Sequence, residues 1–522
     1  MIVVVGGGLN GLVAGAVLAR RGRPVTILDQ RPVVGGTAIT TEFAPGFHAP
    51  TLSHAFGPVA GDVLAALGLD AEALDLVAPD PPVTVIGPAG AAARVCLDDE
   101  ATGASLRPVS SHDARQWRGF ARAMRAIGGV LRSIDRHPPP DLDRPSATDL
   151  FRLLGAGRAA RGLGRDDLAR LLRYVPMAVA DVAAEWFESD VMQAAVCALA
   201  LHGHLAGPWS AGTGLLLLQR VAAEDAPLGR AVTARGGPGA VTARIADVAR
   251  RAGAVVRTDA RVARIETADH RVTGVTLEGG ESIAATAVVA AIDPRQVYLD
   301  LLPPDVLAPS VRDGMRHYRA RGVTMKVNLA LDEAPAFTAI GGDARPLAGR
   351  VLVVPDVDGL ERAFDAAKYG EPSPEPWLDV TVPTVADPSL APAGRHVMSV
   401  VAHFAPRALA TGSWDTRRDE VVRAVVDRLE AEAPGLRARI AGTEALTPED
   451  LERRWALPGG HIFHGEMTLD QWWVARPLLG SPGVRGPIGG LVLAGAGTHP
   501  GGGLTGWPGL LAARAVLEIP VK

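Results

Sequence analysis

Cysteine is nearly absent from this chain of 522 residues, which contains only Cys96 and Cys197. The two cysteines form no CxxC pair, so a dithiol redox centre is disfavoured. Two thiols in so long a chain fit a reducing cytoplasm better than a disulfide-bonded secreted protein. Lysine is also scarce, and arginine supplies most of the basic residues, which we interpret as the codon bias of a GC-rich bacterial genome.

Long hydrophobic runs are absent too. The apolar stretches at residues 192–201 and 215–218 are too short to span a bilayer and are interrupted by His202, His204 and Arg220. The N-terminus lacks the basic residues that begin a secretory signal peptide. We therefore expect a cytoplasmic protein without a transmembrane segment, while contact with a membrane surface stays open. The net charge of −4 gives no reason to expect nucleic acid as a partner.

The chain begins with a strand–helix–strand pattern. Residues 2–5 form an apolar, β-branched run, residues 12–21 have a helical composition that ends at Gly22, and residues 25–28 form a second apolar run. Continuous apolar runs of this kind are typical of buried parallel strands. The pattern predicts the start of an α/β domain.

Glycines at the first turn indicate a dinucleotide site. Gly6, Gly8 and Gly11 form a GxGxxG pattern between the first strand and the helix, where phosphates can bind the free N–H groups of the helix N-terminus. Asp29 ends the second strand, where a carboxylate can accept the hydroxyls of a ribose. Pattern and spacing together favour a nucleotide site over an ordinary glycine turn.

Two further glycine groups distinguish FAD from NAD. Gly35 and Gly36 follow Asp29 closely, and the longer FAD molecule needs close approach of the backbone there. Near the other end of the chain, residues 490–509 read GLVLAGAGTHPGGGLTGWPG, a strand followed by a glycine loop and a new helix. A second helix N-terminus would stabilise the negative charge of a reduced flavin. A plain glycine turn remains the alternative at both positions.

These segments resemble the phytoene dehydrogenase-related flavoproteins, which include carotenoid desaturases of bacterial type. The matching stretches are VVGGGLNGLVAGAVLARRG, GGTAITTEFAPGFHAPTLSH, GPWSAGTGLLLL, GGPGAVTARIADVARRAG, GGHIFHGEMTLDQWWVARP and GAGTHPGGGLTGWPG, and they span most of the chain. The resemblance implies that Val262 contacts adenine and that Gly497, Thr505 and Gly506 face the flavin ring. The full set of implied FAD-binding residues is Gly6, Gly8, Leu9, Asn10, Gly11, Asp29, Gln30, Arg31, Gly35, Gly36, Thr37, Ser53, His54, Val262, Gly497, Thr505 and Gly506.

Residues for proton transfer are harder to identify. His464, Glu466 and His499 lie in the two C-terminal motifs, and histidine suits general acid or base chemistry near neutral pH. The alternative, that these side chains brace loops by hydrogen bonding, stays open. His48 and His54 follow the second glycine pair and are further candidates for approaching the ring.

The apolar segment LALHGHLAG is a candidate wall of a substrate tunnel. No third ligand stands at a suitable spacing from His202 and His204, so no metal site is expected there.

The expected fold class is α/β, a Rossmann-like FAD-binding domain of the two-dinucleotide-binding flavoprotein type with an inserted substrate domain of mixed sheet and helices. Residues 1–100, 231–300 and 485–522 are expected to form the FAD domain. Residues 101–230 would form a helical cap and residues 301–484 the substrate domain.

The expected activity is hydride transfer from a C–H bond of a small apolar substrate, isoprenoid- or polyene-like by resemblance, to flavin N5. No second GxGxxG pattern follows a strand, so oxygen or a quinone is the expected electron acceptor rather than NAD(P). Two alternatives use the same fold. One is a flavin-dependent reductase or redox-neutral cyclase or isomerase of natural-product biosynthesis, and the other is a non-enzymatic prenyl-binding escort protein.

Overall fold

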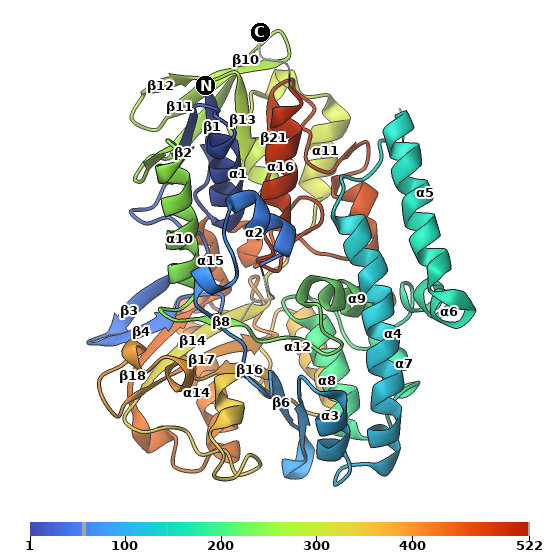
Figure 1. Ribbon diagram of the computed structural model, residues 1–522. Coiled ribbons are helices and arrows are strands. Elements are labelled where there is room, and N and C mark those ends of the chain that lie inside the picture. Colours follow the sequence, from blue (N-terminus) through green and yellow to red (C-terminus); the bar gives the residue numbers. More distant parts are fainter. Residues whose placement is uncertain (55–58, 143–144, 520–522) are drawn as a thin grey trace.

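Two β-sheets of different character organise the chain, with a group of helices beside them (Figure 1). The computed structural model describes residues 1–54, 59–142 and 145–519, so the last three residues of the expected segment 485–522 lie outside the described part.

The first sheet is parallel and draws its strands from three distant parts of the chain. Its order is β21-β13-β1-β2-β9. The central strand β1 pairs in parallel with β2 on one side and β13 on the other, and β21 and β9 form the edges. The strands are β1 (Ile2–Val5), β2 (Val25–Leu28), β9 (Val255–Arg257), β13 (Ala287–Ala290) and β21 (Leu491–Leu493). The parallel sheet confirms the expected α/β fold class. Segments near both ends of the chain contribute strands to it.

Side chains of β1 alternate between two buried faces of the sheet. Ile2 and Val4 belong to a core shared with the helices α1, α10 and α16. Val3 and Val5 belong to a second core shared with the small antiparallel sheet β10-β11-β12. Burial of both faces explains the continuous apolar run in the sequence. The bounds are α1 (Leu9–Arg20), α10 (Pro238–Arg251), α16 (Trp507–Leu517), β10 (Val262–Ala268), β11 (Arg271–Leu277) and β12 (Ser282–Ala284).

The second sheet has seven strands in the order β18-β14-β17-β16-β15-β6-β7. All neighbouring pairs are antiparallel except β15 and β6. The strands are β6 (Val83–Ile86), β7 (Ala92–Val95), β14 (Thr324–Leu331), β15 (Arg350–Val353), β16 (Leu378–Thr381), β17 (His396–His403) and β18 (Ile440–Leu446). One face packs on α14 (Trp414–Glu432), whose Trp414, Val421, Val425 and Leu429 join the core of that face.

The sheet pairing differs from the expected division of the chain at one point. Strands β6 and β7 precede residue 100 and were expected in the FAD domain, but β6 pairs with β15 of the second sheet and β7 pairs with β6. They follow no glycine turn of the nucleotide-binding type, and their apolar residues complete a core with β15 and the helical region. The boundary at residue 100 therefore does not separate the two sheets.

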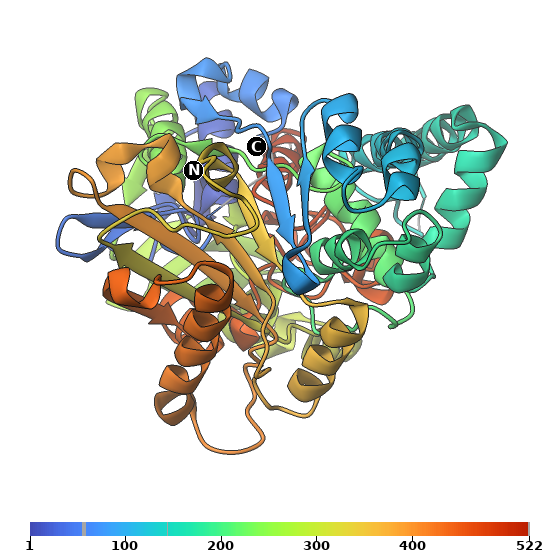
Figure 2. The same cartoon turned by 90° about the horizontal axis from the view of Figure 1, so that it is seen from below.

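The helical region stands to one side of both sheets, as the view from below shows (Figure 2). Helices α8 and α9 are almost entirely buried, whereas α5 has no buried residue. Within the described residues, no helix is both long and apolar enough to cross a bilayer. The helices outside the FAD domain include α3 (Asp99–Leu106), α4 (Ser111–Asp135), α5 (Ala147–Gly162), α6 (Gly164–Tyr174), α7 (Val179–Ala184), α8 (Asp190–Leu201), α9 (Thr213–Glu224), α11 (Pro309–His317), α12 (Val357–Lys368) and α15 (Pro448–Trp455).

Substitution of Gly509 tests the contact between the two ends of the chain. A Cβ atom at Gly509 would lie 2.2 Å from the carbonyl oxygen of Asn10, so G509A forces α1 and α16 apart. We expect a loss of about 1–3 kcal/mol of stability from this overpacking, seen as a lower melting temperature and earlier release of flavin fluorescence. The control G155A lies in α5, where a Cβ meets no atom within 4 Å, and should be neutral or stabilising by up to about 1 kcal/mol. Equal melting temperatures for the two variants would contradict the close packing.

Candidate functional site

A cavity of about 290 Å³ connects the first turn of the FAD domain with the seven-stranded sheet. Most of the residues that the sequence implicates in FAD binding line it. These are Gly6, Gly8, Leu9, Asn10, Asp29, Gln30, Arg31, Gly35, Gly36, Thr37, Ser53, His54, Val262 and Thr505. Gly11, Gly497 and Gly506 do not line the cavity.

The glycines of the first turn allow backbone segments to approach closely. A Cβ atom at Gly11 would lie 1.9 Å from the carbonyl oxygen of Gly6, so Gly11 serves the packing of helix on strand. Gly36 has a φ of +64°, and a Cβ atom there would lie 3.0 Å from the Cα of Gly8. Gly8 is the N-cap of α1, and its approach to Gly36 leaves the free N–H groups of the helix open to the cavity.

Asp29 organises the loop that follows β2. Its carboxylate accepts hydrogen bonds of 2.9 Å from the backbone N–H groups of Gly7 and Arg31. The Arg31 guanidinium donates to the carbonyl of Gly36 at 2.9 Å, which ties the two glycine segments together. Burial raises the pKa of Asp29, although these hydrogen bonds and the charge of Arg31 oppose the shift. Asp29 thus lies at the cavity where a ribose hydroxyl can reach it.

The C-terminal glycine loop forms another part of the cavity wall. Gly501, Gly502, Gly503, Leu504 and Thr505 line the cavity directly before α16. The glycine loop that leads into α16 therefore lines the same cavity as the N-terminal turn of α1. The neighbouring Gly497 is enclosed instead, because a Cβ atom there would lie 2.4 Å from Pro294 Cδ and 2.8 Å from the carbonyl oxygen of His464.

These features fit FAD. The N-terminal turn of α1 and the glycine loop before α16 line one cavity, Asp29 lines it where a ribose can be bound, and close glycine contacts bring the backbone segments together. Gly6, Gly8 and Asn10 would hold the pyrophosphate, Asp29 the ribose, and Thr505 the ring region. Gly11 and Gly506 would act through packing, because neither lines the cavity.

Of the three proton-transfer candidates in the C-terminal motifs, only His464 lines the cavity. The hydroxyl of Tyr318 donates to the carbonyls of His464 at 3.0 Å and Gly497 at 3.3 Å, which ties His464 to the C-terminal glycine loop. Burial and the charges of Arg476 and Arg295 together lower the pKa of His464 to about 4. The imidazole is therefore neutral at pH 7.

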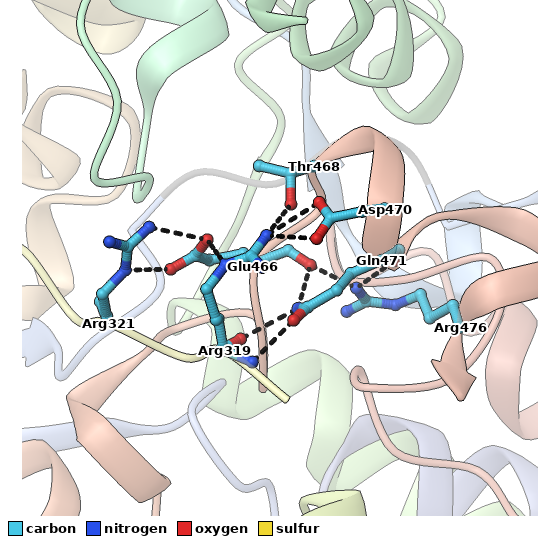
Figure 3. A network of polar contacts seen from close by, with 7 residues as sticks. All are labelled: Arg319, Arg321, Glu466, Thr468, Asp470, Gln471 and Arg476. Carbon is cyan, nitrogen blue, oxygen red and sulfur yellow. Dashed lines mark hydrogen bonds and ion pairs between the residues drawn. The ribbon is translucent and has the colours of Figure 1, made fainter. Parts of the chain in front are cut away.

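Glu466 differs from the expectation, because it does not line the cavity. Its carboxylate accepts hydrogen bonds from Arg319 Nε at 3.0 Å and from Arg321 Nε at 2.6 Å (Figure 3). Burial raises the pKa of Glu466, but the hydrogen bonds and charges of Arg321 and Arg319 outweigh burial and hold the pKa below its usual range. Glu466 braces its loop as a permanent carboxylate rather than exchanging a proton with a substrate.

Of the other histidines, His499 is fully buried but does not line the cavity. Burial lowers its pKa to about 3, so it is a neutral core residue and not the expected proton carrier. His48 lies on β4 (Phe47–Pro50), also away from the cavity. His54 and His202 do line the cavity, whereas His204 does not.

The cavity wall formed by the seven-stranded sheet contains charged residues that motif reasoning missed. Lys326, Arg350 and Asp379 come from β14, β15 and β16, and all three are nearly inaccessible to solvent. Arg350 binds Asp379 through two hydrogen bonds, one of them 3.1 Å long. Polar and apolar residues alternate in the strands of Lys326 and Asp379, a pattern that ordinarily indicates one face in water, so the pattern did not indicate a buried wall.

Asp293 is a further missed residue. It lines the cavity three positions after β13, as Asp29 does directly after β2. Burial raises the pKa of Asp293 to about 6, against the lowering charge and hydrogen bonds of Arg295. The end of a buried parallel strand was a usable signal here, because ligands of such sheets bind at the carboxyl ends of the strands.

Neither metal nor dithiol chemistry has a site in the described part of the chain. No group of three or more histidine, cysteine or acidic residues there is arranged to hold a metal ion. Cys96 and Cys197 are both free thiols, and burial raises the pKa of each.

Comparison with known proteins identifies relatives over the full length. Residues 9–517 match the family described as flavin containing amine oxidoreductase. The chain is 33% identical to "pyridine nucleotide-disulfide oxidoreductase domain-containing protein 2" of Rattus norvegicus, over 99% of this chain and 93% of that protein. It is 30% identical to phytoene dehydrogenase of Streptomyces griseus, over 96% and 92%. The fold of cyclohexylamine oxidase from Brevibacterium oxydans is similar, with a TM-score of 0.60 and 17% identity over 99% of this chain and 98% of that one.

The charge network of Glu466 should contribute stability that depends on pH. In E466Q the hydrogen bonds from Arg319 and Arg321 lose their charged acceptor, at a cost of about 1.5–3 kcal/mol. Because the pKa of Glu466 is depressed in the folded state, the wild type should be more stable than E466Q by a constant free-energy margin near neutral pH. The margin should shrink as pH falls below about 4.3, the ordinary pKa of glutamic acid.

Melting temperatures measured between acid and neutral pH test this expectation. The control E278Q removes an exposed ion pair with Arg261 and should change the melting temperature little at any pH. A margin between wild type and E466Q that grows in acid would contradict the assignment of a permanently charged Glu466.

Proposed function

The chain belongs to the flavin containing amine oxidoreductase family, and we propose that this FAD-dependent oxidoreductase is a dehydrogenase that forms a carbon–carbon double bond in its substrate. The observation that carries the proposal is the continuity of one cavity. It leads from the dinucleotide-binding turn, past the C-terminal glycine loop and His464, to a wall formed by the second sheet. A substrate on that wall lies in the same space as the flavin.

The chemistry divides between cofactor and protein. Bound FAD supplies the acceptor for a hydride from a substrate C–H bond. Loss of hydride leaves an electron-poor carbon, which makes a proton on the neighbouring carbon acidic. His464 is the residue that would take that proton, because it lines the cavity and its imidazole is neutral at pH 7. The electron pair of the C–H bond that loses the proton forms the new double bond.

Apolar side chains support a substrate with a hydrocarbon skeleton. Leu52, Met325, Val401, Ile462 and Phe463 line the cavity between the glycine loops and the charged wall. Such walls exclude water and orient a flexible apolar chain by burial. An isoprenoid- or polyene-like skeleton agrees with these walls.

Two alternatives use the same cavity. A reductase would transfer electrons from the flavin to the substrate. A cyclase or isomerase would return the hydride to the substrate. Dependence on FAD disfavours the non-enzymatic prenyl-binding escort. The cytoplasm as location, and oxygen or a quinone as electron acceptor, stay predictions.

Anaerobic reduction of the bound flavin tests the direction of the reaction. We expect denatured protein to release FAD, and candidate isoprenoids added without oxygen to bleach the flavin absorbance and yield a product that has lost a pair of hydrogen atoms. Bleaching by NAD(P)H alone, followed by saturation of a substrate, would identify a reductase. A product of unchanged mass would identify an isomerase or cyclase.

His464 can be tested by replacement with asparagine, which tolerates its φ of 54°. We expect H464N to keep its FAD and to lose about 10²–10⁴-fold in kcat, because the proton acceptor at the cavity is gone. The matched control is H48N, at a histidine that does not line the cavity, and it should keep the wild-type rate. Full activity in H464N would assign proton removal to another group.

A further inference from the structure

Asp293 is a buried carboxylate that lines the cavity and has no part in the chemistry proposed above. Its side chain is inaccessible to solvent, with 0% of the residue exposed. Glu224 and Asp379, which also line the cavity, form ion pairs with arginines of the wall made by α9 and the second sheet. Asp29 lies where it can bind the ribose. A buried carboxylate is costly, so Asp293 needs an explanation of its own.

The backbone segment that contains Asp293, residues 291–294, lies between the two glycine loops. On one side it contacts Gly6 of the first turn, where a Cβ atom would lie 3.0 Å from a carbonyl oxygen of the segment. On the other side it contacts Gly495 of the C-terminal loop, where a Cβ atom would lie 2.2 Å from the next carbonyl oxygen. Asp293 therefore reaches the cavity between the turn that would hold the pyrophosphate and the loop that would face the flavin ring.

The two carboxylate oxygens of Asp293 are used unequally. Oδ1 accepts a hydrogen bond of 2.7 Å from the backbone N–H of Arg295, and it lies 3.5 Å from Nε of the same arginine. Oδ2 has no hydrogen-bond partner among the residues that the structure describes. Buried polar atoms are usually bonded, so a free carboxylate oxygen on a cavity wall indicates a ligand that donates a hydrogen bond.

The charge of Asp293 limits what that ligand group can be. Burial raises the pKa of Asp293 to about 6, against the charge and hydrogen bonds of Arg295. Above neutral pH the carboxylate is therefore ionised, and an ionised carboxylate only accepts hydrogen bonds. A phosphate offers no donor and would be repelled, whereas a hydroxyl group donates. Between its pyrophosphate and its ring, FAD carries its hydroxyl groups on the ribityl chain.

We propose that Oδ2 of Asp293 accepts a hydrogen bond from a hydroxyl group of the ribityl chain of FAD. Asp293 is then a cofactor-binding residue that fixes the chain between the pyrophosphate and the ring, while Arg295 holds the carboxylate through Oδ1. Asp29 and Asp293 would each bind one of the two hydroxyl-bearing parts of the cofactor. The inference depends on FAD alone, and neither the substrate nor the direction of electron flow enters it.

Binding of FAD analogues to the full-length apoprotein, freed of its flavin, tests the inference. The probes are FAD, three analogues in which hydrogen replaces the 2′, 3′ or 4′ hydroxyl of the ribityl chain, and ADP, which lacks that chain. Calorimetric titration above neutral pH gives a dissociation constant for each. A hydrogen bond to a charged group contributes enough that at least one analogue should bind the wild type about tenfold or more weakly than FAD does. If all three analogues bind as tightly as FAD, the inference is overturned.

A variant identifies the partner of that hydroxyl. D293A should bind FAD about tenfold or more weakly than the wild type, and it should bind FAD and the sensitive analogue equally, because the acceptor of the hydroxyl is gone. ADP should bind D293A and the wild type equally. The matched control is D305A, which removes an exposed aspartate that does not line the cavity and should bind every probe as the wild type does.

Two results with D293A would overturn the inference. One is wild-type affinity for FAD. The other is a loss of the same factor for FAD, for each analogue and for ADP, which would show that the carboxylate only supports the loop at residues 291–294. Because these measurements follow binding and not turnover, they stand whether or not the protein proves to be a dehydrogenase.

Discussion

The close contact between the two ends of the chain is the constraint on which the site depends. Helix α16 can approach α1 only because Gly509 has no side chain to meet the carbonyl of Asn10. The two helices share one core with Val4 of the central strand. The N-terminal turn of α1 and the glycine loop before α16 therefore line the same cavity, although nearly the whole chain separates them. Without that contact there would be two glycine loops but no common binding site.

Local sequence patterns were enough to predict this domain. The first turn is encoded by Gly6, Gly8 and Gly11 within a few residues, and the strands beside it are apolar on both faces, as parallel strands must be. The polar wall was not predictable in the same way. Lys326 and Asp379 sit in strands where polar and apolar residues alternate, a pattern that ordinarily indicates one face in water. Only the packing of distant elements over that face shows that it is buried.

The proton-transfer candidates also show the limit of prediction from local sequence patterns. The C-terminal motif contributes His464 to the cavity, but the motif alone could not show which of its side chains turns inward. Arg476 decides this, because its guanidinium donates to the carbonyls of Glu466, Phe463 and Ala496 and so joins the His464 loop to the C-terminal glycine loop. Glu466 then points away toward Arg319 and Arg321, and His464 remains at the cavity.

The two ends of the cavity differ in the charged groups that line them. At one end, backbone N–H groups and helix dipoles suit the phosphates of a dinucleotide without any buried cation. At the other end, Arg350 and Asp379 neutralise each other deep inside the protein, where an isolated charge would be strongly destabilising. Lys326 lies on the same wall, and burial lowers its pKa to about 7 although the charges of Asp379 and Glu444 raise it. The polar wall can stay buried beside the cavity because Asp379 lies within 4.0 Å of nitrogen atoms of Arg350, His54 and His202.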